Sequence, residues 1–199
     1  MTDPAEAPAV VKDELREFLL SRRRARPAAD RAAAADAVAS ALLHGLDGVR
    51  TLAAFVPDPD EPGSGRLPAA YTELGARILL PVIPPTGRTL DWAAYTGELE
   101  LGRFGLHHPV GPRQGPSAIG EADAVVVPAL AVDHFGFRLG RGGGYYDRAL
   151  VHARPDAVLV TVVFDDERLA ELPREIHDRP VTAVVTPSGG WQDLAPHRG

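Results

Sequence analysis

The residues with the clearest chemical potential lie in one glycine-rich stretch, "RLGRGGGYYD", which runs from Arg138 to Asp147 and contains four glycines. Glycine has no Cβ, so the backbone of such a stretch can come close to a ligand. Arg138 and Arg141 add positive charge, and we expect a helix to begin at about Tyr145. Unpaired amides at the start of a helix, beside arginines, suit an anion. The stretch predicts a phosphate or nucleotide site; the alternative is a flexible hairpin with exposed arginines.

Two common phosphate-binding motifs do not account for this stretch. A Walker A loop requires a Gly-Lys pair, and the chain contains none. A dinucleotide-binding fingerprint requires a third glycine at the position of Tyr145, and it also requires an acidic residue about 20 residues further on, which is not clearly placed here. A phosphate site in this chain would therefore be of another kind.

Two long helices are predicted in the first part of the chain. Apolar residues recur at helical spacing over about 8–24, where they form one face: Val11, Leu15, Phe18 and Leu19. An alanine-rich segment predicts a second helix over about 29–43, with Gly45 placed to end it. Because Lys12 and Arg16 are four residues apart, they project from the same side of the first helix.

Compact apolar runs between and after these segments predict buried strands at 49–57, 77–83, 124–130, 157–164 and 181–186. A short helix is expected at 67–76, and an excursion of short strands and loops at 91–116. We predict a frayed tail over 189–199. Strands that alternate with helices indicate an α/β fold with a mostly parallel sheet sandwiched by helices in three layers. In such folds ligands bind at the carboxyl ends of the strands, and the glycine stretch follows such an end.

Composition narrows the possible functions. The 199 residues suffice for a single domain with one core, ordered over about 8–188, and no apolar run approaches the roughly 20 residues that span a bilayer. Without cysteine there are no disulfides, thiolate metal sites or cysteine nucleophiles. The net charge of −6 argues against general nucleic-acid affinity, so a cationic site must be local. The N-terminal segment does not read as a signal peptide. We expect a cytoplasmic monomer whose partners are small molecules, not nucleic acid or membrane.

The glycine stretch resembles the signature of the 5-formyltetrahydrofolate cyclo-ligase family, also called 5,10-methenyltetrahydrofolate synthetases. In that family a proline-containing strand end leads into R-L-G-x-G-x-G-Y-Y-D, and all of these positions match after Pro128. The segment "VKDELREFLLSRR" resembles the family's opening helix, and "HDRPVTAVVTP" resembles its closing element. Order and spacing agree over nearly the whole chain, which is more specific than a glycine loop alone.

The resemblance implies an ATP- and Mg²⁺-dependent ring closure, in which 5-formyltetrahydrofolate and ATP give 5,10-methenyltetrahydrofolate, ADP and phosphate. The formamide oxygen would attack the γ-phosphate to give an imidate phosphate, N10 would close the ring, and phosphate would depart. Such a reaction requires positioning, charge neutralisation and exclusion of water more than a nucleophilic side chain.

The resemblance also implies roles for individual residues. The catalytic set is Lys12, Arg141 and Tyr145. The ATP-binding set is Lys12, Arg16, Arg138, Leu139, Gly140, Arg141, Gly142, Gly143, Gly144, Tyr145 and Tyr146. The folate-binding set is Val56, Glu61, Arg141, Gly142, Gly143, Gly144 and Tyr145. The residues implied to hold Mg²⁺ are Asp147 and Asp178.

Plainer alternatives stand beside these roles. Lys12 and Arg16 suit a solvated helix face, Glu61 an exposed loop, and Asp147 the capping of a helix by a carboxylate. The chain also departs from the family, since Ser64 replaces a usual Thr and His108 stands where relatives often carry an acid or amide. Two other functions therefore stay open: a folate- or nucleotide-binding regulatory module without turnover, and an ATP-dependent enzyme for another formyl or amide substrate.

Overall fold

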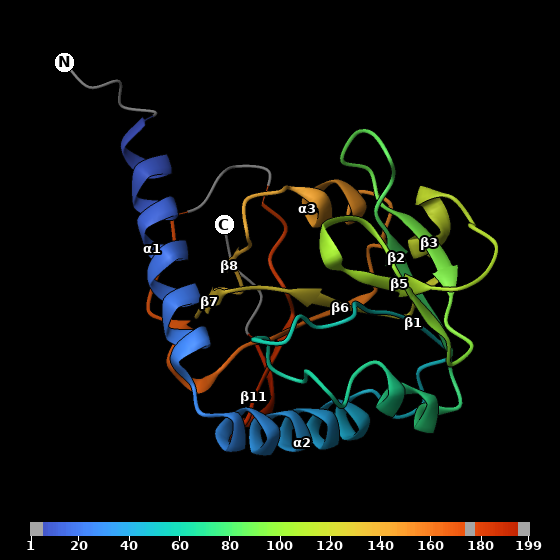
Figure 1. The fold of residues 1–199 in the computed structure, drawn as a ribbon, viewed down its shortest axis with the longest axis horizontal. Coiled ribbons are helices and arrows are strands. Elements are labelled where there is room, and N and C mark those ends of the chain that lie inside the picture. Colours follow the sequence, from blue (N-terminus) through green and yellow to red (C-terminus); the bar gives the residue numbers. More distant parts are fainter. Residues whose placement is uncertain (1–5, 174–177, 195–199) are drawn as a thin grey trace.

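The protein, a computed structural model in which residues 6–173 and 178–194 are described, is built around a seven-stranded sheet (Figure 1). The strand order is β12-β11-β9-β6-β1-β2-β3. The bounds are Thr51–Ala53 (β1), Arg77–Val82 (β2), Asp91–Ala94 (β3), Ala124–Pro128 (β6), Val158–Val162 (β9), Ala183–Thr186 (β11) and Gly190–Asp193 (β12). The five inner strands pair in parallel, and the edge strands β3 and β12 are antiparallel to their neighbours. The predicted mostly parallel sheet is confirmed.

Helical elements cover both faces of this sheet, which confirms the predicted layers. Helix α2 (Ala28–Gly45) lies against one face through buried side chains such as Val38 and Leu42. The other face is covered by α3 (Tyr145–Ala149) and the 3₁₀ helix η3 (Pro116–Glu121), as Figure 1 shows with α2 below the sheet and α3 above it. Within the described part of the chain, no helix has the length and apolar character that a membrane span requires.

Helix α1 (Glu6–Ala25) does not pack on the main sheet but on a small three-stranded one. This second sheet contains β10 (Arg168–Leu169), β7 (Ala131–Asp133) and β8 (Arg138–Leu139), in that order. Leu19 of α1 is 1% exposed and packs with Leu130 and Leu139. Since β8 leads directly into the glycine stretch, this packing places the first helix beside it.

The remaining elements are short. A hairpin of β4 (Leu99–Leu101) and β5 (His107–Pro109) forms the third sheet. Three further 3₁₀ helices complete the described structure: η1 (Ala69–Leu74), η2 (Arg103–Gly105) and η4 (Asp165–Glu167). The short helix predicted at 67–76 is thus a 3₁₀ helix, η1, and the predicted excursion at 91–116 divides between the main sheet and this hairpin.

The prediction of a frayed tail is wrong for the residues that form β12. Gly190–Asp193 pair with β11, and the ring of Trp191 packs over Gly45, where an added Cβ would lie 2.1 Å from it. An edge strand with a tryptophan anchored on α2 gains backbone hydrogen bonds and apolar burial, which offset the entropy lost on ordering. Residues 195–199 lie outside the described residues.

Side chains of the inner strands should be the least tolerant of substitution by alanine. Leu79 of β2 is fully buried, so Leu79→Ala should lower the free energy of unfolding by about 3 kcal/mol. Leu101 of β4 is 69% exposed, and Leu101→Ala should change the free energy of unfolding by less than about 0.5 kcal/mol. Urea unfolding of both variants measures the difference. Equal losses would contradict the assignment of the core.

Candidate functional site

A cavity of about 970 Å³ opens beside the carboxyl ends of the parallel strands. Its wall includes residues at or just after three of these strand ends: Phe55 after β1, Ile83 after β2 and Pro128 at the end of β6. The wall also contains every residue in the catalytic, ATP, folate and metal sets: Lys12, Arg16, Val56, Glu61, Arg138, Leu139, Gly140, Arg141, Gly142, Gly143, Gly144, Tyr145, Tyr146, Asp147 and Asp178. The fold brings together residues far apart in the sequence.

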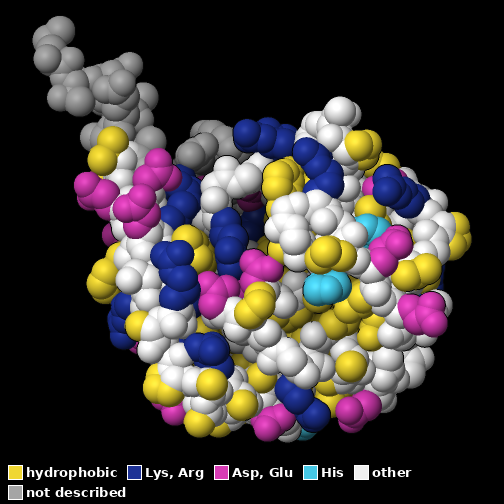
Figure 2. Space-filling view, in the orientation of Figure 1, with side chains coloured by type: hydrophobic (Ala, Val, Ile, Leu, Met, Phe, Trp, Pro, Cys, Tyr) yellow, Lys and Arg dark blue, Asp and Glu magenta, His cyan; other side chains and the backbone are white. Residues whose placement is uncertain are grey.

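The cavity carries positive charge although the whole chain is acidic. Side chains of one lysine and six arginines line it: Lys12, Arg16, Arg88, Arg103, Arg138, Arg141 and Arg148. Figure 2 shows this hollow, with dark-blue Lys and Arg side chains inside it and along its edge. Its size matches a pocket for a small organic ligand, and its charge suits an anionic one.

The glycine stretch forms the loop between β8 and α3. Gly142 (φ 88°) and Gly144 (φ 65°) have left-handed backbone conformations that other residues rarely adopt. Arg16 of α1 donates a hydrogen bond from Nε to the carbonyl oxygen of Gly140, at 2.9 Å. The first helix and the loop are therefore in direct contact, and the loop presents its backbone to the cavity.

Lys12 and Arg16 lie one turn apart on the side of α1 that faces the cavity. Arg16 also pairs with Asp13, at 2.5 Å, and its side chain is only 21% exposed. Arg16 is therefore partly buried, and both residues line the cavity. Two cations held on a helix suit the phosphates of a nucleotide.

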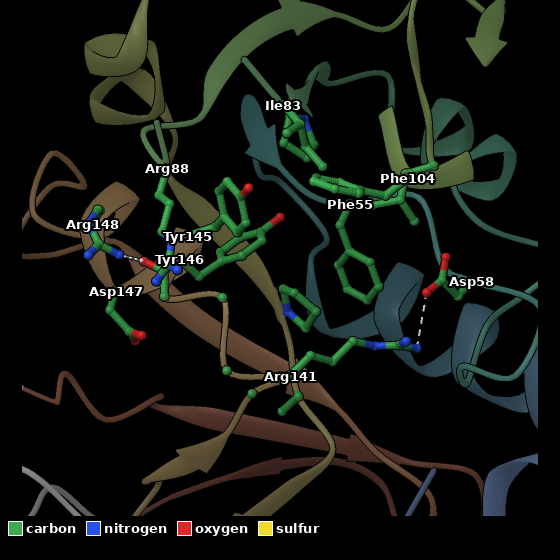
Figure 3. A pocket seen from close by; sticks show the side chains of 18 of the residues that line it. Phe55, Asp58, Ile83, Arg88, Phe104, Arg141, Tyr145, Tyr146, Asp147 and Arg148 are labelled. Carbon is green, nitrogen blue, oxygen red and sulfur yellow. Dashed lines mark hydrogen bonds and ion pairs between the residues drawn. The ribbon is translucent and has the colours of Figure 1, made fainter. Parts of the chain in front are cut away.

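Arg141 crosses the cavity toward an acidic loop that follows β1. Its Nη2 lies 3.0 Å from Asp58 Oδ2, 3.2 Å from Asp60 Oδ1 and 3.1 Å from Glu61 Oε1. Figure 3 shows the side chain extended toward Asp58 and away from Asp147. Burial alone would lower the pKa of Arg141, but the three carboxylates outweigh it and raise the pKa. Arg141 is therefore a paired cation whose side chain is still 42% exposed.

Glu61 is a buried carboxylate and not an exposed loop acid, since its side chain is 9% exposed. Its Oε2 accepts the backbone N–H of Asp58 at 3.0 Å. Its Oε1 faces Arg141 at 3.1 Å and Nη1 of Arg23 at 3.8 Å. Burial raises the pKa of Glu61, although both arginines and the N–H of Asp58 act to lower it. An ionised Glu61 would offer a strong acceptor to N–H donors of a ligand.

Aromatic side chains complete the wall. Tyr146 lines the cavity, and its ring lies 6.4 Å from that of the fully buried Trp92 with 84° between the planes. Its hydroxyl is buried without a hydrogen-bond partner among the described residues, and burial raises its pKa, so it stays protonated. In Figure 3, Tyr145 and Tyr146 lie on one side of the cavity, and Phe55 and Phe104 lie on the other, near Asp58.

The two candidate magnesium ligands flank one arginine. Asp147 pairs with Nη2 of Arg138 at 2.5 Å, and Asp178 attracts the same guanidinium. Burial lowers the pKa of Arg138, and both carboxylates counter this. Asp147 lies in the first turn of α3, where a carboxylate also suits the helix dipole. No cluster of three or more potential metal ligands occurs in residues 6–173 and 178–194. Two carboxylates that both reach the cavity fit Mg²⁺, which takes its other ligands from phosphate and water.

Sequence reasoning missed two charged residues behind the site. Arg23 of α1 and Glu167 of η4 are both buried, at 0% and 1% exposure, and they form a bidentate ion pair. Arg23 follows Leu15 and Leu19 at intervals of four residues, so helical periodicity could have placed it on the buried face. Asp58 and Asp60, which pair with Arg141, were also missed, whereas Glu61 was predicted as a site residue.

Comparison with known proteins gives a consistent result. A family model described as the 5-formyltetrahydrofolate cyclo-ligase family matches residues 8–187. The chain is 46% identical over 184 residues to a 5-formyltetrahydrofolate cyclo-ligase of Mycolicibacterium smegmatis, which covers 90% of this chain and 95% of that protein. An Escherichia coli (strain K12) cyclo-ligase is 32% identical over 148 residues, 71% of this chain and 80% of that one. The NMR structure of Aquifex aeolicus 5,10-methenyltetrahydrofolate synthetase superposes with a TM-score of 0.76 at 28% identity, covering 95% of both chains.

The raised pKa of Glu61 predicts that this residue costs stability. A carboxyl group whose pKa is higher in the folded than in the unfolded state destabilises the fold when ionised, and the cost disappears as pH falls through the folded pKa. Glu61→Gln should therefore raise the melting temperature at about pH 8, and the gain should shrink toward about pH 5. Glu73→Gln, at an exposed position of η1, is the matched control. A lower melting temperature for Glu61→Gln at about pH 8 would contradict the prediction.

Proposed function

The chain belongs to the 5-formyltetrahydrofolate cyclo-ligase family and has the activity of that family, and we propose that it closes the ring with ATP and Mg²⁺ through an imidate phosphate. One observation carries this proposal: a single cavity joins a cationic wall of Lys12, Arg16 and the glycine loop to a wall with the buried Glu61. The first wall suits the phosphates of ATP, and the second suits a reduced folate. All of these residues come from one chain, so we propose that the monomer is active.

On the nucleotide side, we assign phosphate binding to Lys12, Arg16 and Arg138, together with the loop from Leu139 to Tyr146. The left-handed glycines of this loop hold its backbone open toward the cavity. Arg138 also stands between the two carboxylates proposed for the metal, so it connects the phosphate and metal positions.

On the folate side, we assign Glu61 to the N–H donors of the pteridine, because a buried carboxylate oxygen binds such donors strongly. Val56 borders the same part of the cavity and supplies apolar contact. The glycine loop and Tyr145 lie between the two sides and adjoin the reacting formyl group in this scheme.

The chemistry then needs little beyond positioning. The formyl oxygen attacks the γ-phosphorus while the bond to the oxygen of ADP breaks. N10 next attacks the formyl carbon, phosphate leaves with the former formyl oxygen, and N10 releases its proton. Lys12 and Arg141 offset the negative charge on the transferring oxygens, and the surrounding protein excludes water that would hydrolyse the intermediate.

The residues present fit a magnesium ion. Asp147 and Asp178 would hold it, with further oxygens from ATP and water. When bound, Mg²⁺ would neutralise charge on the phosphate oxygens and so favour attack on the γ-phosphorus by a weak nucleophile. Arg138 pairs with Asp147 and is attracted by Asp178.

The direct test follows the methenyl product by its near-ultraviolet absorbance after purified protein is mixed with 5-formyltetrahydrofolate and Mg²⁺, with and without ATP. We expect product only with ATP. Lys12→Ala should lower kcat/KM by about 100-fold, and Arg24→Ala, at an exposed position of the same helix, should leave it within about twofold. A flat trace from protein that binds folate would favour the regulatory module. Turnover of another formyl or amide substrate in its place would favour the other enzyme.

Lys12 can also be tested without turnover, because it is the only lysine of the chain. The native protein is acetylated with a limiting amount of an amine-reactive reagent such as acetic anhydride. Mass spectrometry then reports the extent of labelling at this one side chain. ATP with Mg²⁺ should protect Lys12, and the α-amino group of the chain serves as the internal reference. Equal labelling of Lys12 with and without ATP would exclude it as a phosphate ligand.

Magnesium dependence tests the paired carboxylates. Asp147→Asn and Asp178→Asn should each raise the Mg²⁺ concentration needed for half-maximal rate by about tenfold or more, because each removes one charged ligand. The control is Asp47→Asn, at an exposed position after α2, which should not change the Mg²⁺ concentration needed for half-maximal rate. A normal magnesium requirement in both site variants would place the metal elsewhere.

A further inference from the structure

Glu61 faces two guanidinium groups that differ in their freedom to move. Arg141 approaches Oε1 from the cavity at 3.1 Å, and its side chain is 42% exposed. Arg23 approaches the same oxygen from the protein interior at 3.8 Å and is 0% exposed. One carboxylate oxygen therefore lies between a cation at the cavity and a cation in the core.

Arg23 is fixed by contacts on three of its sides. Nε and Nη2 donate to the two carboxylate oxygens of Glu167 at 2.7 and 2.8 Å, and Nη2 also donates to the carbonyl oxygen of Ala129 at 2.8 Å. The ring of Phe164 lies 5.8 Å from the guanidinium carbon. The remaining nitrogen, Nη1, has no hydrogen-bond partner among the described residues and lies 3.8 Å from Oε1 of Glu61. A buried nitrogen of a charged group is costly to leave unpaired, which suggests a use for it.

Arg141 cannot serve the phosphate and Glu61 equally well at the same time. In the structure it is held by Asp58, Asp60 and Glu61. When it turns toward the γ-phosphate, Glu61 loses its nearest cation while it is still buried. A buried carboxylate without a cation tends to take up a proton, and a protonated Glu61 would be a weaker acceptor for the folate.

We propose that Arg23 is a positioning residue for the ring closure, holding Glu61 as the folate acceptor while Arg141 is engaged with the phosphate. Arg23 does not touch the substrate in this scheme and acts only through Glu61. The inference rests on the proposed binding of folate by Glu61. It assigns a function to a charged pair that the proposed reaction does not otherwise require.

The other charged or titratable groups around Glu61 do not replace Arg23. Asp58, in the same loop, adds negative charge, although its backbone N–H binds Oε2. Tyr146 of α3 is neutral because burial raises its pKa. If Arg141 moves to the phosphate, Arg23 is therefore the cation that still neighbours Glu61 among these groups.

The test uses the full chain with the double substitution Arg23→Met and Glu167→Gln. Removing Arg23 alone would leave a buried carboxylate unpaired and could unfold the protein, whereas the double variant removes both charges. Glutamine at 167 keeps an oxygen for the backbone N–H of Phe164, which Glu167 accepts at 2.8 Å. Far-ultraviolet circular dichroism and thermal melting establish that the variant is folded. Arg26→Met is the control, since Arg26 also stacks on Phe164, at 4.0 Å, but pairs with Asp166.

We expect the double variant to raise KM for 5-formyltetrahydrofolate by about tenfold at about pH 7, and by more at about pH 6. The effect on KM is larger at the lower pH because loss of Arg23 raises the pKa of Glu61 further, so Glu61 becomes protonated at a higher pH. The control Arg26→Met should keep KM within about twofold at both values. In a Glu61→Gln background, the double substitution should add nothing, because its effect passes through that carboxylate.

Three results would overturn this inference: a folded double variant with native KM at both pH values, an equal increase in the Glu61→Gln background, or an equal increase from Arg26→Met. Failure of the proposed function would look different. If Glu61→Gln alone keeps native KM, Glu61 is not the folate acceptor, whatever the double variant does.

Discussion

The buried ion pair between Arg23 and Glu167 is the interaction on which the geometry of the site depends. It joins α1 to the segment that follows β9, and it reaches the carbonyl of Ala129 after β6. A helix with a fully buried arginine cannot shift without separating charges in a poorly solvated interior, which would cost several kcal/mol. Lys12 and Arg16 stand on the same helix, about three and two turns before Arg23, respectively. The ion pair therefore fixes the position of the two residues proposed to bind the nucleotide phosphates.

The cavity combines two kinds of electrostatic environment. Around Lys12, Arg16 and Arg138, cations border the glycine loop and suit multiply charged phosphates. Around Glu61, a carboxylate lies in a buried setting that raises its pKa. Arg141 lies in the cationic glycine loop, but its side chain contacts Glu61. If Arg141 binds phosphate as proposed, this contact would compete with its pairing to Glu61 and would couple the two halves of the cavity.

Sequence patterns predicted the sheet, the two long helices and the start of α3, because these depend on local periodicity and on apolar runs. They were less accurate for which side of α1 is buried. Val11 and Phe18 belong to the predicted apolar face but are 50% and 56% exposed, whereas Arg23 is fully buried. An arginine is predicted at the surface unless its partner is known, and Glu167 lies 144 residues away. The partners of Arg141 were missed for the same reason, since "DPDE" reads as an exposed turn.

Several buried polar groups near the site are not fully satisfied within the described structure. The hydroxyl of Tyr146 and Nη1 of Arg23 have no hydrogen-bond partner within the described structure, and Glu61 is ionised only against the cost of its burial. Each of these would lower stability in a protein selected for stability alone. Of these groups, Tyr146 and Glu61 line the cavity, so a bound ligand would restore interactions to them and not to Arg23. Part of the binding energy would then be available to turn Arg141 from its carboxylates toward the phosphate, as the proposed reaction requires.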